Sequence, residues 1–165
     1  MGYNTAFLMI EGVSAAGAMD LFDSRFDAAD LFASPNTALL FEEAVSSFLH
    51  PDLALGEAGG WAVFWDPSAG LISSGFPLAA SRDRRVFTAL LGSADSRFEC
   101  GWFAGGTERP EAVRSAGAGL NIPEWGADED FVFEVMERLA GITCADLAAA
   151  LYRRLEFLGV ESLGV

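Results

Sequence analysis

Residues 86–103 read VFTALLGSADSRFECGWF, and this stretch predicts a β-hairpin. Two apolar runs, 86–91 and 97–103, flank the turn-forming residues GSADS. In the second run apolar residues alternate with polar or small ones, which is typical of a strand with one buried face. The apolar members of the alternation are Phe98, Cys100 and Trp102. An antiparallel sheet is therefore the predicted framework of the fold.

Other segments add strands to this framework. Residues 4–10 are almost continuously apolar, which predicts a central strand covered on both faces. Residues 61–65 and 71–73 flank the turn cluster DPSAG at 66–70 and predict a second hairpin. Residues 111–116 predict one more strand, at an edge. We expect a mostly antiparallel sheet of about five to six strands.

Two helices are expected in the first third of the chain. Residues 14–33 predict a short helix. Ser34 and Pro35 suit the cap and first turn of another, because the Ser oxygen can accept an orphan amide and Pro lacks the amide that would need a partner. This second helix is expected to run to about Leu49 and to stop before Pro51.

Two consecutive helices are expected at the C-terminus. The first opens at Asp128, carries an apolar stripe at helical spacing and ends at Gly141. The second begins at Thr143, with inward-facing leucines. These leucines are Leu147, Leu151, Leu155 and Leu158. The predicted fold class is α+β, with the helices packed on the sheet.

Length and composition predict a single globular domain spanning residues 1–165. The chain is 52% apolar, and 24 acidic residues oppose 10 basic ones, giving a net charge of −14. Such a charge repels nucleic acids and anionic membrane surfaces. Arg82, Arg84 and Arg85 form a basic patch that Asp83 interrupts, and we interpret it as a solvated loop. The basic residues are all Arg, which we attribute to a GC-rich genome.

A cytoplasmic location is expected. Two cysteines without C-x-x-C spacing favour a reducing compartment. The N-terminus lacks the basic region of a secretory signal, and no apolar run approaches the roughly 20 residues of a membrane-spanning helix.

An acidic cluster beside a tryptophan is the candidate binding site. It comprises Glu124, Trp125, Asp128, Glu129 and Asp130. Carboxylates in a first helical turn complement the helix dipole, so capping is the first interpretation, ahead of partner recognition and of metal binding or catalysis. We expect no metal and no cofactor.

No catalytic set is recognisable, and the protein is expected not to be an enzyme. The triplet His50-Pro51-Asp52 resembles the loop signature of J-domain co-chaperones, but those proteins place a basic helix before it, whereas Glu42 and Glu43 precede it here. Residues 125–142 and the opening strand resemble those of small proteins from high-GC bacteria, a likeness to which no function is attached.

Three functional hypotheses remain open. The first is a protein-binding module of the immunity type, which neutralises a basic toxin or enzyme. The second is a small-ligand-binding domain with a pocket between sheet and C-terminal helices, lined by Trp102 and Phe103. The third is an enzyme whose nucleophile is Cys144, with a thiolate stabilised by the first turn of the last helix. The first interpretation of Cys144 is nevertheless a small buried residue that packs beneath the preceding helix. The sequence does not set the oligomeric state.

Overall fold

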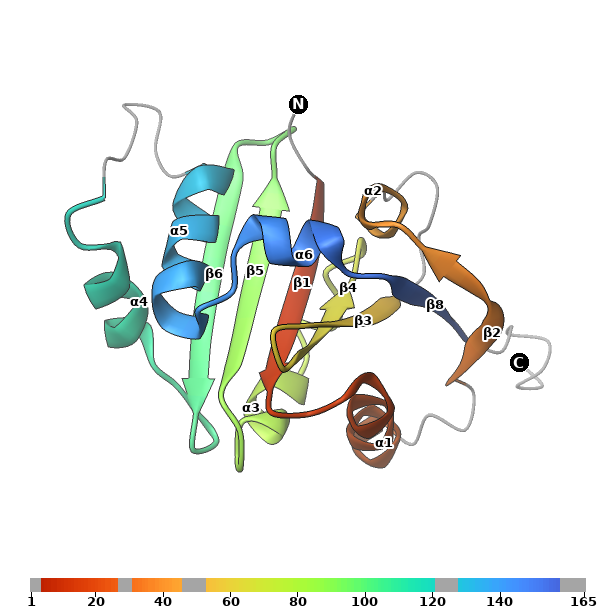
Figure 1. Cartoon of the computed structure of the whole chain (residues 1–165). Helices are drawn as coiled ribbons and strands as arrows, with labels where there is room; N and C mark the ends of the chain where they lie inside the picture. Colours follow the sequence, from red (N-terminus) through yellow and green to blue (C-terminus); the bar gives the residue numbers. More distant parts are fainter. Residues whose placement is uncertain (1–3, 27–30, 46–52, 121–127, 158–165) are drawn as a thin grey trace.

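The computed structural model describes residues 4–26, 31–45, 53–120 and 128–157, with backbone alone for 22–26, 31–39 and 154–157. One sheet runs through the molecule (Figure 1). Its strands are β1 (Asn4–Glu11), β2 (Leu31–Leu39), β3 (Ala54–Ala58), β4 (Trp61–Trp65), β5 (Val86–Gly92), β6 (Arg97–Ala104), β7 (Thr107–Glu108) and β8 (Tyr152–Phe157). The helices are α1 (Ala15–Phe26), α2 (Phe41–Ala44), α3 (Phe76–Ala80), α4 (Pro110–Gly117), α5 (Glu129–Ala140) and α6 (Cys144–Ala149).

The eight strands are ordered β2-β8-β3-β4-β1-β5-β6-β7, and every neighbouring pair is antiparallel. The predicted α+β class and antiparallel sheet are thereby confirmed. β1 pairs with β4 on one side and β5 on the other, and Ala6 to Ile10 are fully buried. The expectation of a central, doubly covered strand at the N-terminus is correct.

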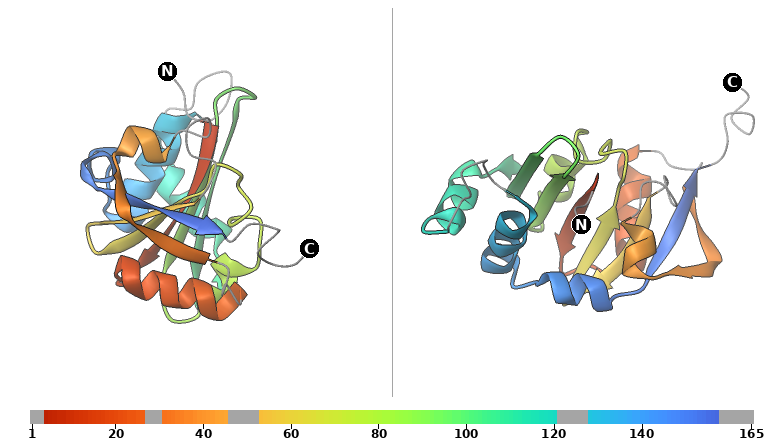
Figure 2. Two further views of the ribbon diagram at one scale, coloured as in Figure 1. Left: turned by 90° about the vertical axis from the view of Figure 1, so that its right-hand side faces the viewer. Right: turned by 90° about the horizontal axis from the view of Figure 1, so that it is seen from above.

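Helices cover both faces of the sheet. Because side chains alternate along a strand, Phe7 and Met9 of β1 join one apolar cluster with Val135 of α5, whereas Leu8 and Ile10 join another on the opposite face. We call α2, α4, α5 and α6 the front layer and the apolar cluster beneath them, which includes Phe7 and Met9, the front cluster. α1 and α3 are the back layer, and the cluster that includes Leu8 and Ile10 is the back cluster. Figure 2 shows α5 and α6 on one side of the sheet and α1 and α3 on the other.

The hairpin predicted for residues 86–103 is confirmed. β5 and β6 pair from Val86 opposite Phe103 to Gly92 opposite Arg97. The alternating set Phe98, Cys100 and Trp102 packs against the front cluster, as expected.

The hairpin expected from residues 61–65 and 71–73 lies earlier in the sequence. It joins β3 to β4 through Gly59 and Gly60, whose φ angles of 55° and 84° suit glycine. Residues 71–73 are a turn. The Asp66 carboxylate explains why, since it accepts the Leu71 amide at 2.6 Å and the Ser68 amide at 3.2 Å and folds the chain back on itself.

The edge strand expected at residues 111–116 is wrong, because this segment is helix α4. Pro110 occupies its first turn, where a missing amide costs nothing. Ala112, Val113 and Ala116 recur at helical spacing and pack against the front cluster.

The helix expected from Ser34 to Leu49 is largely wrong. Residues 31–39 form strand β2, which pairs with β8, and of the described residues 34–45 only those of α2 are helical. The expected stop at Pro51 and the triplet beginning at His50 lie outside the described residues. The short helix expected within 14–33 is present as α1.

The two consecutive C-terminal helices are confirmed, but the second is shorter than expected. α6 ends at Ala149, and the chain then enters the sheet as β8 between β3 and β2. Tyr152 fixes this change of direction, since its buried hydroxyl donates to the Leu147 carbonyl at 2.7 Å. In the described part of the chain no helix is long and apolar enough to span a bilayer.

Candidate functional site

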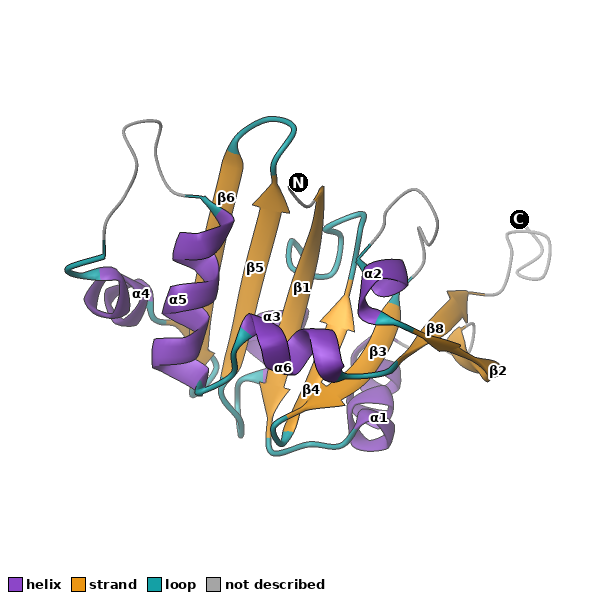
Figure 3. Ribbon diagram, turned by 45° about the horizontal axis from the view of Figure 1, so that its top comes forward, coloured by secondary structure: helices purple, strands orange, loops and turns teal. Residues whose placement is uncertain are grey.

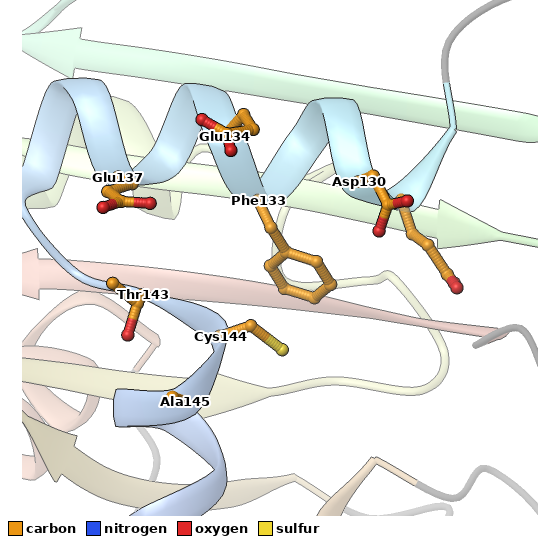
Figure 4. A pocket seen from close by; sticks show the side chains of 8 residues that line it. Asp130, Phe133, Glu134, Glu137, Thr143, Cys144 and Ala145 are labelled. Atoms are coloured by element: carbon orange, nitrogen blue, oxygen red, sulfur yellow. The ribbon is translucent and has the colours of Figure 1, made fainter. Parts of the chain in front are cut away.

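An open depression of about 550 Å³ lies between α5 and α6 on the front of the molecule (Figure 4). Its walls are mainly acidic side chains of α5, and its far side is the first turn of α6. The lining residues are Glu129, Asp130, Phe133, Glu134, Glu137, Thr143, Cys144 and Ala145.

Helical periodicity explains why the acids of α5 gather on one side. Residues three and four positions apart share a face, so Asp130, Glu134 and Glu137 line up along the depression. Val132, Val135 and Met136 point the opposite way and are buried against the sheet. Burial of this apolar stripe therefore holds the carboxylates outward.

The two helices that frame the depression begin with side-chain caps. Asp128 accepts the Phe131 amide at 3.1 Å at the start of α5. At the start of α6 Thr143 accepts the Asp146 amide at 3.1 Å, and Asp146 in return accepts the Thr143 amide at 2.8 Å. The capping interpretation is correct for Asp128, whose carboxylate thus has a structural task.

Phe133 forms the apolar part of the depression. Its ring lies nearly parallel to that of Phe7 on β1, with centroids 6.2 Å apart, and it points into the gap between α5 and α6 (Figure 4). The ring is half-buried. The depression thus combines carboxylate walls with an aromatic surface that is supported by the sheet.

Cys144 lies in the first turn of α6, as expected, and its surroundings do not favour a thiolate. Burial raises the pKa of the thiol, and the negative charges of Glu129 and Asp130 raise it further. Cys100 is partly buried and packs against the front cluster, and burial raises the pKa of its thiol to about 11. At neutral pH both thiols therefore carry their protons.

The depression belongs to a wider acidic surface. We call α2, α5 and α6 the acidic helices, because together they carry seven carboxylates and one arginine, Arg138. Arg138 reaches towards α4, donating to the carbonyls of Ala116 and Ala118 at 2.9 and 3.2 Å. The seven carboxylates belong to Glu42, Glu43, Glu129, Asp130, Glu134, Glu137 and Asp146.

Among the residues that the structure describes, no three acidic, cysteine or histidine side chains are grouped so that they could hold a metal ion. The carboxylates of α5 are spread along the helix instead of converging on one point. Such an arrangement attracts positive charge over an extended surface.

The structure brings part of the predicted binding cluster together. Glu129 and Asp130 line the depression, whereas Asp128 caps α5; Glu124 and Trp125 lie outside the described residues. Sequence reasoning missed Glu134, Glu137 and Thr143. The first two share the helical spacing of Asp130, a signal that was present in the sequence once α5 was expected.

The ligand pocket expected beside Trp102 and Phe103 is not formed by these residues. Trp102 packs in the front cluster against Trp61, with ring centroids 6.0 Å apart, and Phe103 packs in the back cluster. Adjacent residues of one strand point to opposite faces of the sheet, so the two rings cannot line the same cavity.

Comparison with protein-family models, curated proteins and solved structures gives no match to this chain.

Proposed function

We propose that the chain is a non-catalytic protein-binding module of the immunity type, which neutralises a basic toxin or enzyme in the cytoplasm. The observation that carries the proposal is the imbalance of seven carboxylates to one arginine on the acidic helices. The free state of both cysteines supports a reducing location.

The physical basis is electrostatic steering. A surface of one sign raises the rate at which an oppositely charged partner arrives, by about 10- to 1,000-fold. A cationic active site, such as one that binds phosphates, is a suitable target because its charge is also concentrated. The acidic helices would cover that site and exclude its substrate.

The test compares two variants with the same net charge. Glu134→Arg with Glu137→Arg reverses two charges of the depression. Asp20→Arg with Asp83→Arg reverses two charges of the back side, where both residues are exposed. Wild type and variants are immobilised, exposed to soluble extract of the source cells, and the retained proteins are identified by mass spectrometry.

The expected result is a basic protein retained by wild type and by the back-side variant, and lost from the depression variant. Its association rate with wild type, measured by stopped-flow, should fall steeply between about 0.01 M and 1 M salt, where the Debye length shrinks from about 30 Å to 3 Å. Addition of the chain should inhibit the partner's activity. Retention that is equal in all three proteins, or an association rate that is independent of salt, would contradict the proposal.

The depression itself favours a second candidate, a small cationic ligand. Its volume of about 550 Å³ is within the range of small-molecule sites, although such sites are usually more enclosed and more apolar. A thermal-shift series with spermine tests this candidate, since a ligand at 100 times its dissociation constant stabilises by about 2.7 kcal/mol. The shift should disappear in the Glu134→Arg, Glu137→Arg variant. A shift that persists there, or no shift in wild type, removes the candidate.

A further inference from the structure

Three large apolar side chains are exposed in the described part of the chain. Leu40 is 60% exposed, Leu151 62% and Leu78 45%. Leu78 belongs to α3, in the back layer. Leu40 and Leu151 immediately precede α2 and β8 respectively, beside the acidic helices.

The pairing of β2 with β8 brings Leu40 and Leu151 together. Leu39 is the partner of Tyr152 in the antiparallel ladder, so the next residues along the two strands are Leu40 and Leu151. α2 also packs on α6 and on β8. Figure 3 shows α2 beside the end of α6 where β8 begins. We call these two residues the leucine pair.

Electrostatic attraction alone does not make a long-lived complex. Long-range charge mainly sets the association rate, whereas the dissociation rate depends on contacts from which water is excluded. A protein that neutralises an enzyme therefore needs an apolar contact within or beside its charged surface. Of the three exposed leucines, only the leucine pair borders the acidic helices.

The charges around the leucine pair indicate what covers it. Glu42 and Glu43 lie two and three residues after Leu40, and α5 and α6 carry further carboxylates. Among the side chains that the structure describes, Arg153 is the exposed basic one nearest in sequence to Leu151. A second copy of the chain docking here would bring two carboxylate-rich surfaces together. A cationic partner would instead neutralise them while burying the leucines.

On the basis of the proposed function, we infer that the leucine pair is the apolar anchor of the complex with the basic partner. The partner then presents an apolar or aromatic side chain flanked by Arg or Lys. Its apolar group packs on Leu40 and Leu151, and its cationic groups contact the acidic helices.

Photo-cross-linking tests the contact directly. Benzoylphenylalanine is placed at position 40, 151 or 78 of the full chain, and each protein is illuminated in soluble extract of the source cells. Positions 40 and 151 should give an adduct with the same basic protein, in a yield at least about fivefold above that at position 78. The Glu134→Arg, Glu137→Arg background should abolish the adduct. An adduct with a second copy of the chain, an adduct with a non-basic protein, or no excess over position 78 overturns the inference.

The second measurement is the dissociation rate of the complex with the purified partner protein that the cross-link identifies. Leu40→Ser with Leu151→Ser should raise the dissociation rate by about tenfold or more and leave the salt dependence of association unchanged. Serine suits the position before α2, so the fold is retained. Leu78→Ser is the matched control and should change neither rate. Unchanged dissociation with intact salt-dependent association would overturn the leucine anchor alone, whereas salt-independent association would overturn the proposed function.

Discussion

The front and back of this molecule have equivalent cores but different surfaces. Each side buries apolar residues of the same strands, with Phe7 and Met9 facing the front and Leu8 and Ile10 facing the back, all fully buried. The surfaces differ in charge. The acidic helices carry seven carboxylates and one arginine, whereas Asp20 is the one charged residue among the described side chains of α1 and α3.

The acidic helices thus account for six of the 14 net negative charges of the chain. An acidic composition that served solubility alone would be satisfied by carboxylates distributed over both sides. Here stability is supplied by a core that both layers share, whereas the helices of the front layer carry more carboxylates than the described side chains of the back layer. Stability and surface charge can therefore be perturbed separately.

The largest expected effect tests whether both layers hold the fold equally. Phe7→Ala should lower the free energy of unfolding by about 3–5 kcal/mol and Leu8→Ala by about 2–5 kcal/mol, because each leaves a cavity in a fully buried site. Urea unfolding measures both. If one of these neighbouring substitutions were tolerated, the layer it faces would not be packed on the sheet, and the comparison of the two sides would fail.

A smaller effect is expected where the front layer joins the sheet. A methyl group on Gly56 of β3 would lie 2.5 Å from the Tyr152 ring and 2.6 Å from the Leu151 carbonyl oxygen. Gly56→Ala should therefore cost about 1–3 kcal/mol through overpacking. Gly70→Ala is the control, since its methyl group meets only the Ser68 hydroxyl at 3.5 Å. Equal urea midpoints for the two variants would contradict the close packing of β3 on β8.

The sequence predicted the elements whose signals are local. The hairpin of β5 and β6 combines turn residues with period-2 alternation, and α5 combines a cap, a stripe and Gly141, which adopts the left-handed φ of 73°. The acidic residues at the start of α5 were also recognisable. These features depend on neighbours within a few positions of one another.

The errors arose where distant pairing decides the structure. Residues 31–39 carry a good helix start at Ser34 and Pro35, yet they form an edge strand because β8 offers a partner more than 100 residues later in the sequence. In the same way, the leucine spacing after Thr143 continues a helical pattern into residues that instead pair with β3 as strand β8. Single-sequence periodicity contains no information about such partners.

The site was predicted in part for the same reason. Glu129 and Asp130 were selected as a local cluster, but the depression exists only because α6 packs across from α5 and brings Cys144 near them. The helix dipole predicted a lowered pKa for this thiol. Burial and the carboxylates of the neighbouring helix instead raise the pKa, and neither could be placed without the tertiary structure.

A third prediction separates structural from exposed carboxylates on α5. Asp128→Ala should cost about 1 kcal/mol, because it leaves the Phe131 amide without its cap. Asp128→Ser keeps an acceptor and should restore most of the stability, although it also removes the charge. Thermal and urea unfolding measure the pair. Equal losses for both variants would mean that the charge of Asp128, and not its hydrogen bond, stabilises α5.

The smallest expected effect is a gain in stability from removing an acid of the depression. Glu137 is exposed, lies in the last turn of α5 and is three residues from Glu134, so its charge opposes both the helix dipole and a like charge. Glu137→Gln should therefore raise the free energy of unfolding by about 0.5–1 kcal/mol at low salt, and the gain should fade near 1 M salt, where the Debye length is about 3 Å.

Asp83→Asn on the back side is the control: Asp83 stands between Arg82 and Arg84, so its neutralisation should bring no gain. A gain that is unchanged by salt, or that appears equally in Asp83→Asn, would remove the argument that the front surface keeps its carboxylates at the expense of stability. A salt-dependent gain confined to Glu137→Gln would mean that the fold alone does not favour this charge, which is the condition expected of a surface that serves binding.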